Sequence, residues 1–246
     1  MCILIVLRGF HDEHPVVVAS NRDERTDRPE SPPGLWIGER ARLLSPRDRR
    51  AGGTWLAIDA RGRFAGITNL AGVPPVPDAP SRGHLVHLVL DHGDLDAGVH
   101  AVEARVRKQA HSGFQLVLGD RQRLLVVRHA RGQFSVVEWT APVFVATNEH
   151  EPGRLQPRGL PPAVVPGLSL DRRLELLAAV LSDRGGDGHH AICKRGDGYG
   201  TVSSSLLALP DGGPLGLVWR YAPGPPDVTS YRNYGNLGRR LLPDDA

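Results

Sequence analysis

The sequence predicts an α+β protein in which two mainly antiparallel sheets pack face to face with helices on their outer sides. Apolar runs rich in β-branched residues occur in pairs joined by short polar turns, which is the pattern of β-hairpins. Apolar residues at helical spacing occupy separate segments between these groups of strands. The resulting order of strands, helices, strands, helix and strands suits two such layers.

Two hairpins are predicted in the first third of the chain. The apolar runs 3–7 and 15–19 are separated by a polar stretch, and TWLAID and RFAGITN flank a short turn further on. Residues 25–50 are rich in Arg, Pro and Glu, so we expect a surface loop there. Residues 71–80 contain several prolines and are expected to form a second loop.

Three segments have the apolar spacing of helices. They predict helices over 82–91 and 96–110, and a third that begins near Asp171 and ends before Gly185-Gly186. Short strands are predicted from FQLVLGD to VFVATN, and a last hairpin joins TVSSSLLALP to LGLVWRYAP. The proline-rich stretches each lie between elements that one sheet can share, so we predict a single domain over residues 1–246.

The composition argues against several classes of function. The net charge is +3 and aromatic residues make up 5% of the 246 residues, with no basic stripe interleaved with aromatics, so nucleic-acid binding is not expected. The apolar runs are too short to cross a bilayer, and the opening run lacks the basic segment that precedes a signal-peptide core. We therefore expect a soluble, cytoplasmic protein and leave its oligomeric state open.

The cysteine at position 2 is the first candidate for chemistry. The chain has two cysteines, Cys2 and Cys193, which are too few for a disulfide framework or a four-thiolate zinc site. Removal of the initiator methionine would leave Cys2 with a thiol and a free α-amine of pKa about 7.7–8.0, which can act as the base for that thiol. The alternative is that Cys2 is a small buried hydrophobe, and Cys193 is expected to be a core thiol.

A polar cluster, SNRDER at 20–25, follows the second apolar run. If the first two strands pair as a hairpin, this cluster lies near the start of the chain. A carboxylate there would orient the amine or the thiol of Cys2, and we select Asp23 for this role. The alternative is a solvated turn with internal salt bridges, which is what charge runs usually are.

These residues together resemble the NRDE family, also called the transport and Golgi organisation protein 2 family. The motifs in chain order are Cys2, Asn21-Arg22-Asp23-Glu24, Gly52-Gly53-Thr54-Trp55-Leu56, Ile67-Thr68-Asn69, Gly113-Phe114, Leu118-Gly119-Asp120, Thr147-Asn148 and Tyr199-Gly200-Thr201. The joint occurrence of NRDE and GGTWL is the specific part of the match. The resemblance implies a four-layer αββα fold like that of N-terminal nucleophile hydrolases, distantly similar to choloylglycine hydrolases.

The resemblance also implies roles for individual residues. Cys2 would be nucleophile and base, and Asp23 would be the carboxylate that orients it. Asn69 and Asn148 would donate to the oxyanion, a task that suits an amide because it donates without adding charge. Either asparagine could instead be a turn former at the end of its strand.

The remaining motif positions are assigned to binding. They are Asn21, Arg22 and Glu24 in the polar cluster and Trp55 in GGTWL.

The chain departs from the hydrolase pattern at two positions. Ser20 stands where the hydrolases have an arginine before the asparagine of the second-strand motif, and Val202 stands where an arginine follows Tyr-Gly-Thr. Arg22 or Arg195 could replace these charges in space.

Two functions are carried forward. The first is a cysteine amidohydrolase or acyltransferase that acts on a small acyl amide or thioester and requires no cofactor. The second is a non-catalytic carrier on the same scaffold, with haem or an acyl-CoA or other lipid as the transported ligand, which the family resemblance implies. A purely structural partner-binding module has no positive support.

No metal site is predicted. His84 and His87 are three residues apart on one expected helix face, with His92 beyond, but a third ligand and an HExxH glutamate are missing. We expect these histidines at the surface or half-buried.

Overall fold

The computed structural model describes residues 2–149, 151–186 and 190–243. The chain forms two compact units, which are described separately below. The first unit combines residues 1–28 with 141–236, and the second combines residues 29–140 with 237–246. The single domain over 1–246 stays a prediction. Short 3-10 helices occur at η1 (Pro214–Gly216) and η2 (Gly235–Leu241).

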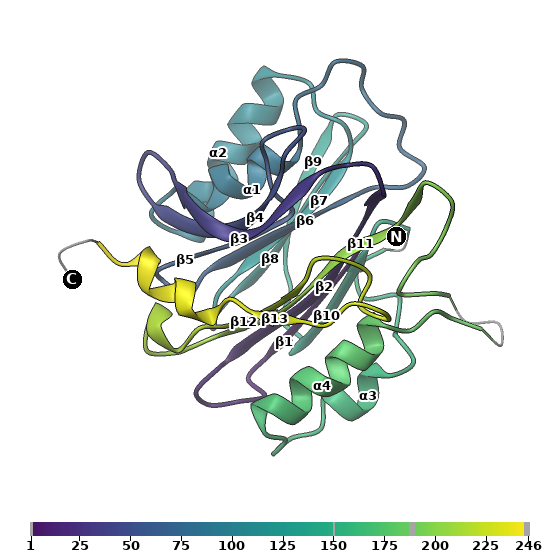
Figure 1. Ribbon diagram of the computed structural model, residues 1–246. Coiled ribbons are helices and arrows are strands. Elements are labelled where there is room, and N and C mark those ends of the chain that lie inside the picture. Colours follow the sequence, from purple (N-terminus) through teal and green to yellow (C-terminus); the bar gives the residue numbers. More distant parts are fainter. Residues whose placement is uncertain (1, 150, 187–189, 244–246) are drawn as a thin grey trace. The chain divides into compact units, whose positions relative to one another are not determined.

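The first unit contains a six-stranded antiparallel sheet in the order β10-β1-β2-β11-β12-β13, with α3 and α4 along one face (Figure 1). The strands are β1 (Ile3–Arg8), β2 (Val16–Arg25), β10 (Val143–Thr147), β11 (Tyr199–Leu209), β12 (Val218–Ala222) and β13 (Arg232–Asn233). The helices are α3 (Leu160–Ala163) and α4 (Leu170–Leu181).

Alternation along the strands explains how this sheet packs. Successive side chains of a strand point to opposite faces, so Ile3, Ile5 and Leu7 share a face, and they are buried against Leu174 and Leu177 of α4. Helix α4 begins one residue before the position that the sequence indicates. Both predicted hairpins of this unit, β1–β2 and β11–β12, are confirmed.

The polar cluster 20–25 differs from the turn that charge runs usually form. It continues β2 to Arg25, because β11 pairs with it through Ser204 opposite Asn21 and Thr201 opposite Asp23. Polar residues can occupy this strand because β11 pairs with its main chain as far as Arg25, and β1 pairs with it as far as Asn21. A register irregularity between Thr201 and Ser203 interrupts the pairing beside the cluster.

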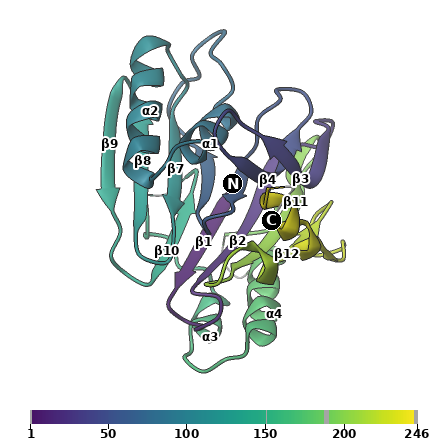
Figure 2. The ribbon, with the colours of Figure 1, turned by 90° about the vertical axis from the view of Figure 1, so that its left-hand side faces the viewer.

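The second unit contains a seven-stranded antiparallel sheet in the order β3-β4-β5-β6-β7-β8-β9, with α1 and α2 beside it (Figure 2). The strands are β3 (Glu30–Ile37), β4 (Arg42–Asp48), β5 (Leu56–Asp59), β6 (Phe64–Asn69), β7 (Phe114–Gly119), β8 (Leu124–Ala130) and β9 (Gln133–Glu138). The helices are α1 (Gly83–Leu90) and α2 (Leu95–Lys108), within two residues of the predicted bounds.

The prediction of a surface loop over residues 25–50 is wrong. This segment completes β2 and then forms β3 and β4. Prolines 32 and 33 obscured β3 in the sequence, and they are tolerated because β3 is the edge strand and its register is irregular between Ser31 and Gly34. The segment 71–80 contains no helix or strand, as predicted.

Helices α1 and α2 cover the sheet of the second unit through a shared apolar core. Leu85 and Val89 of α1 and Val102 of α2 are buried with Leu116 and Val127 of the sheet. The two predicted helices and the β5–β6 hairpin are therefore confirmed.

The two helices also approach each other closely. A side chain at Gly98 of α2 would collide with the main-chain oxygen of Val89. Glycine is therefore required at this contact.

A buried ion pair joins the β5–β6 hairpin to the end of α1. The Arg63 guanidinium lies 2.6 Å from Asp59 Oδ2 and donates to the main-chain oxygens of Leu90 and His92 at 3.0 and 2.7 Å. Both side chains are about 5% exposed or less. Because the guanidinium also ties down the chain after α1, the pair fixes this helix on its sheet.

Asp59→Asn is predicted to lower the free energy of unfolding by about 3–5 kcal/mol, because it leaves the buried Arg63 without its counter-charge. The amide oxygen can still accept the main-chain N–H bonds of Arg61 and Arg63, so the variant tests the charge. Urea denaturation followed by far-UV circular dichroism measures the change. The control is Arg107→Gln, which removes an exposed pair with Glu103 and should cost about 1 kcal/mol or less. Equal losses in the two variants would contradict the prediction.

Candidate functional site

The thiol of Cys2 lies at the end of the first unit's sheet where β1 begins. Cys2 is half-buried, and its Sγ donates a hydrogen bond to the main-chain oxygen of Asp23 at 3.5 Å. The next residue, Ile3, pairs with Asn21 of β2 on one side and Thr147 of β10 on the other. Both neighbouring strands therefore bring their polar ends to the level of Cys2.

The Asp23 carboxylate is held in place by β11. Asp23 is 4% exposed, and its Oδ1 accepts a hydrogen bond from Thr201 Oγ1 at 2.7 Å. Thr201 Oγ1 in turn accepts from the Lys194 main-chain N–H at 2.9 Å. The Tyr199 hydroxyl donates to the Asp23 main-chain oxygen at 3.2 Å. The motif Tyr199-Gly200-Thr201 thus fixes both the carboxylate and the main chain of Asp23.

Burial sets the protonation of these groups. Desolvation, with a smaller contribution from the Asp23 charge, raises the pKa of the Cys2 thiol to about 11, so it is protonated at neutral pH. Desolvation also raises the pKa of Asp23, against the opposing effect of the Thr201 hydrogen bond. Burial raises the pKa of the Tyr199 phenol as well. A separate general base is therefore needed to accept the thiol proton and form a thiolate here.

Asn148 follows β10 directly. Because Thr147 pairs with Ile3, Asn148 and Cys2 leave neighbouring strands at the same end of the sheet. The Oδ1 atom of Asn148 is buried and has no hydrogen-bond partner among the residues that the structure describes. An unpaired buried amide atom is unusual in a folded protein and is a feature of sites that act on ligands.

The other polar residues of β2 bond largely within the protein. Asn21 Nδ2 donates to the main-chain oxygens of Leu181 and Ile192 at 2.8 and 3.2 Å, which ties β2 to the end of α4. Arg22 is buried and lies 3.9 Å from Glu24 Oε2. Glu24 is also 3.3 Å from the guanidinium of Arg28. Binding roles for Asn21, Arg22 and Glu24 stay predictions.

Two predicted site residues belong to the second unit. Asn69 is the last residue of β6, pairs with Phe114 of β7 and is exposed. Trp55 precedes β5, is half-buried, and its main-chain oxygen accepts from the Ile67 N–H at 3.0 Å. Their roles as oxyanion donor and binding residue stay predictions.

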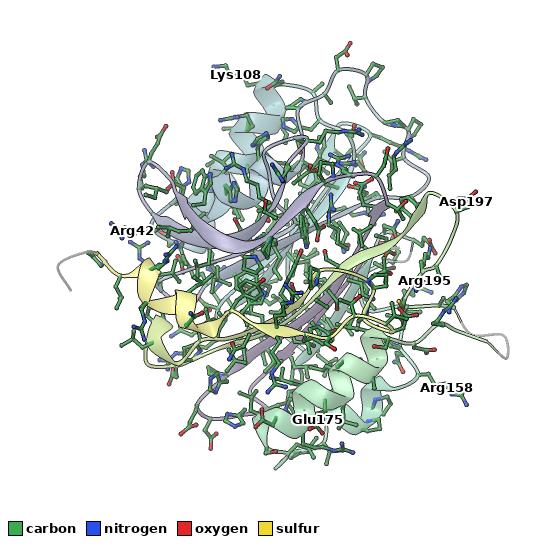
Figure 3. The ribbon with its side chains drawn as sticks, viewed as in Figure 1. Arg42, Lys108, Arg158, Glu175, Arg195 and Asp197 are labelled. Atoms are coloured by element: carbon green, nitrogen blue, oxygen red, sulfur yellow. The ribbon has the colours of Figure 1, made fainter. Side chains whose placement is uncertain are left out.

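Arg22 and Arg195 differ in what they interact with. The charge of Arg22 acts on the Cys2 thiol and partly offsets the rise of its pKa that burial and Asp23 cause. Arg22 also lies on the same face of β2 as Ser20, two residues further along. Arg195, in the loop before β11 (Figure 3), has its Nε 3.6 Å from Asp227 Oδ2.

Sequence reasoning missed two further groups at this end of the sheet. Lys194 Nζ lies 2.9 Å from Glu149 Oε1, and the lysine's charge favours the ionised form of Asp23. Glu149 directly follows Asn148, and Lys194 is one of the chain's two lysines, but neither stands in a motif that would single it out. Thr201 was noted as part of a motif without a role. Its contact with Asp23 becomes visible only from the pairing of β2 with β11.

In the described part of the chain, no group of three or more His, Cys, Asp or Glu side chains is arranged to hold a metal ion. None of the described helices combines the length and the apolar character that a bilayer span requires. Cys193 is buried, as predicted, and its Sγ donates to Asp227 Oδ1 at 3.3 Å.

Solved structures with the same fold include two hydrolases. A Caenorhabditis elegans N-acylethanolamine-hydrolyzing acid amidase ortholog aligns with a TM-score of 0.58 and 13% identity, over 85% of this chain and 94% of that one. The C2A mutant of conjugated bile acid hydrolase from Clostridium perfringens aligns with a TM-score of 0.50 and 10% identity, over 95% and 96% of the two chains. At these identities the likeness shows the fold alone, and it confirms the predicted N-terminal nucleophile hydrolase-like class.

Sequence comparison gives the family. The mouse transport and Golgi organization 2 homolog is 33% identical over 108 residues, a match that spans 43% of this chain and 38% of the mouse protein. The human homolog is 25% identical over 227 residues, or 79% of this chain and 82% of the human protein. The family model described as transport and Golgi organisation 2 matches residues 1–156. The chain therefore belongs to the transport and Golgi organisation 2 family.

Proposed function

We propose that this protein is an N-terminal cysteine amidohydrolase or acyltransferase that acts on a small acyl amide or thioester. The observation that carries the proposal is the hydrogen bond from the Cys2 thiol to the main-chain oxygen of Asp23, a residue whose buried carboxylate is held by Thr201. An activated nucleophile requires an adjacent base that a third group holds in place, and the fixed Asp23 carboxylate is that third group for the α-amine of Cys2.

The amine of Cys2, once Met1 has been removed, supplies the base. The thiol alone is protonated at neutral pH because its pKa is about 11. An α-amine of pKa about 7.7–8.0 accepts the thiol proton, and the Asp23 carboxylate stabilises the resulting ammonium. The sulfur then bonds to the acyl carbon, and the amine returns the proton to the leaving group as the amide or thioester bond breaks. Water or another acceptor then releases the acyl group from the cysteine.

The negative charge that develops on the acyl oxygen needs a hydrogen-bond donor to stabilise it. Asn148 suits this task in the first unit, because it stands beside Cys2 at the end of β10 and its side-chain Nδ2 can donate a hydrogen bond without adding charge. Arg22 provides the nearby positive charge that Ser20 and Val202 do not. Asn69 is kept as a second proposed donor.

The fold neighbours support a hydrolase over other enzyme classes. Both are named as hydrolysing enzymes, one for N-acylethanolamines and one for conjugated bile acids. The second is a C2A mutant, so that enzyme has a cysteine at position 2 of its own chain.

A carrier of haem or of acyl-CoA or other lipids is the second candidate function. The observation that favours it is the raised pKa of the Cys2 thiol, which makes the group a poor nucleophile as long as no base is next to it. The replacement of the late arginine by Val202 points the same way.

Turnover of a defined panel tests the proposed function. After intact-mass measurement has shown loss of Met1, the protein is offered an N-acylethanolamine, a taurine-conjugated bile acid and a short acyl thioester. We expect turnover of at least one, its loss in Cys2→Ala, and a fall in kcat of about a hundred- to a thousandfold in Asn148→Ala. Cys193→Ala, which removes the other thiol, should retain activity.

The opposite outcome is also defined. The processed protein could show no turnover and yet give a saturable Soret shift on titration with haemin that Cys2→Ala does not change. This result would overturn the proposed enzymatic function in favour of the carrier function.

Thr201→Val is predicted to shift the acid limb of the kcat profile to higher pH. The hydroxyl favours the ionised form of Asp23, so its loss raises the pKa of Asp23, and activity falls away at a pH about 1–2 units higher. Thr201→Ser keeps the hydroxyl and should restore the profile. An unchanged profile in Thr201→Val would show that Asp23 does not act through its charge.

Alkylation by iodoacetamide is predicted to distinguish the two forms of the N-terminus. In a Cys193→Ala background with Met1 retained, the Cys2 pKa of about 11 leaves roughly one thiol in a thousand ionised at pH 8. The rate should therefore keep rising beyond pH 10, and the processed form should react faster at pH 8. A plateau below pH 9 in the unprocessed form would contradict the raised pKa.

A further inference from the structure

The second unit contains a cavity of 880 Å³ that is lined by its two helices and by β3 and β4. Its wall on α1 comes from His84, His87 and Leu88, and its wall on α2 from Ala101, Ala104, Arg105 and Lys108. These positions recur at intervals of three and four residues, so each set forms one face of its helix. Lys108 stands at the end of α2 (Figure 3). The third wall is the end of β3 with the turn into β4, which the Asp91 carboxylate holds by accepting the N–H groups of residues 39, 40 and 41.

Four cations from three elements line this cavity. Arg40 comes from the β3–β4 turn, Arg47 from β4, and Arg105 and Lys108 from the last turn of α2. Within the described residues, none of the four forms an ion pair. The carboxylates in the lining are Glu39 and the main-chain-bonded Asp91.

Exposed arginines elsewhere in this unit do find carboxylates. Arg107 pairs with Glu103 at 2.7 Å, and Arg123 pairs with Asp96 and Glu138 at 2.7 and 3.1 Å. The helix dipole accounts for basic residues in the last turn of α2, but it does not account for Arg40 and Arg47, which lie on the strand side. The surplus of positive charge is therefore a property of the cavity.

The floor of the cavity is flat and uncharged. The Trp36 ring stacks on the His87 imidazole with centroids 4.3 Å apart and planes inclined by 13°. His87 Nε2 is bonded to Ser45 Oγ at 3.0 Å. Burial, with smaller contributions from the charges of His84 and Arg47, lowers the pKa of His87 to about 4, so this imidazole is neutral at physiological pH. The side walls add Leu88 and the small residues of α2, which leave room for an organic group.

We propose that this cavity binds a phosphate-bearing small molecule. The guanidinium groups of Arg40, Arg47 and Arg105 take the phosphate oxygens in pairs, and the Lys108 ammonium adds a point charge. The organic part of the ligand packs against the Trp36–His87 stack and the alanines of α2. All of these residues belong to the second unit, and the site does not depend on Cys2 chemistry.

Isothermal titration calorimetry with ADP, inorganic pyrophosphate and adenosine tests this site. ADP should bind at least ten times more tightly than adenosine, which lacks the phosphates, and more tightly than pyrophosphate, which lacks the organic part. Arg47→Gln/Arg105→Gln should weaken ADP binding at least tenfold, and added salt should weaken binding to the unsubstituted protein. Both arginines are exposed, and a thermal melt confirms that the variant is folded.

The matched control is Arg158→Gln/Arg239→Gln, which removes the same charge from exposed positions outside the cavity. An equal loss of ADP affinity in this control would overturn the site in favour of non-specific attraction. No binding of ADP or pyrophosphate at millimolar concentration would also overturn it, and adenosine binding as tightly as ADP would remove the role of the cations. Cys2→Ala should leave the titration unchanged, so the outcome is independent of whether the protein is a hydrolase.

Discussion

The candidate site depends on the pairing of the polar end of β2 with β11. Asn21, Arg22 and Asp23 carry groups that are costly to bury, and they remain in a strand because β11 pairs with all three, while β1 pairs with β2 as far as Asn21. Thr201 then supplies the hydroxyl that meets the Asp23 carboxylate. Without that strand pairing, the same residues would form the solvated turn that their composition favours.

The regular elements could be predicted because each is encoded locally. The β1–β2 hairpin, α1, α2 and α4 follow from apolar spacing and turn residues. The edge strand β3 could not be predicted, because Pro32 and Pro33 remove the local signal for a strand and the pairing with β4 is what restores it. Tertiary pairing overrides local preference at this point of the chain.

The candidate site likewise has a part that could be predicted from the sequence and a part that could not. Cys2, Asp23 and Asn148 could be proposed from the sequence because motifs mark them, and the structure places all three at one end of one sheet. The contribution of Thr201 and the proximity of Lys194 to Asp23 required the pairing between residues almost two hundred positions apart. The cavity beside α1 and α2 could not be predicted from the sequence either, because its cations come from three elements and no motif connects them.

The order of strands in the first unit has a consequence for how the protein is made. The hairpin β1–β2 leaves the ribosome first, but its sheet neighbours β10 and β11 are synthesised more than a hundred residues later. At roughly 5–20 residues per second, the hairpin waits many seconds with both edges unpaired. The acid at position 23 meets its hydroxyl partner only after residue 201 has been synthesised, so the nascent chain cannot assemble this centre early. Exposed strand edges make that interval the one in which chaperones matter most.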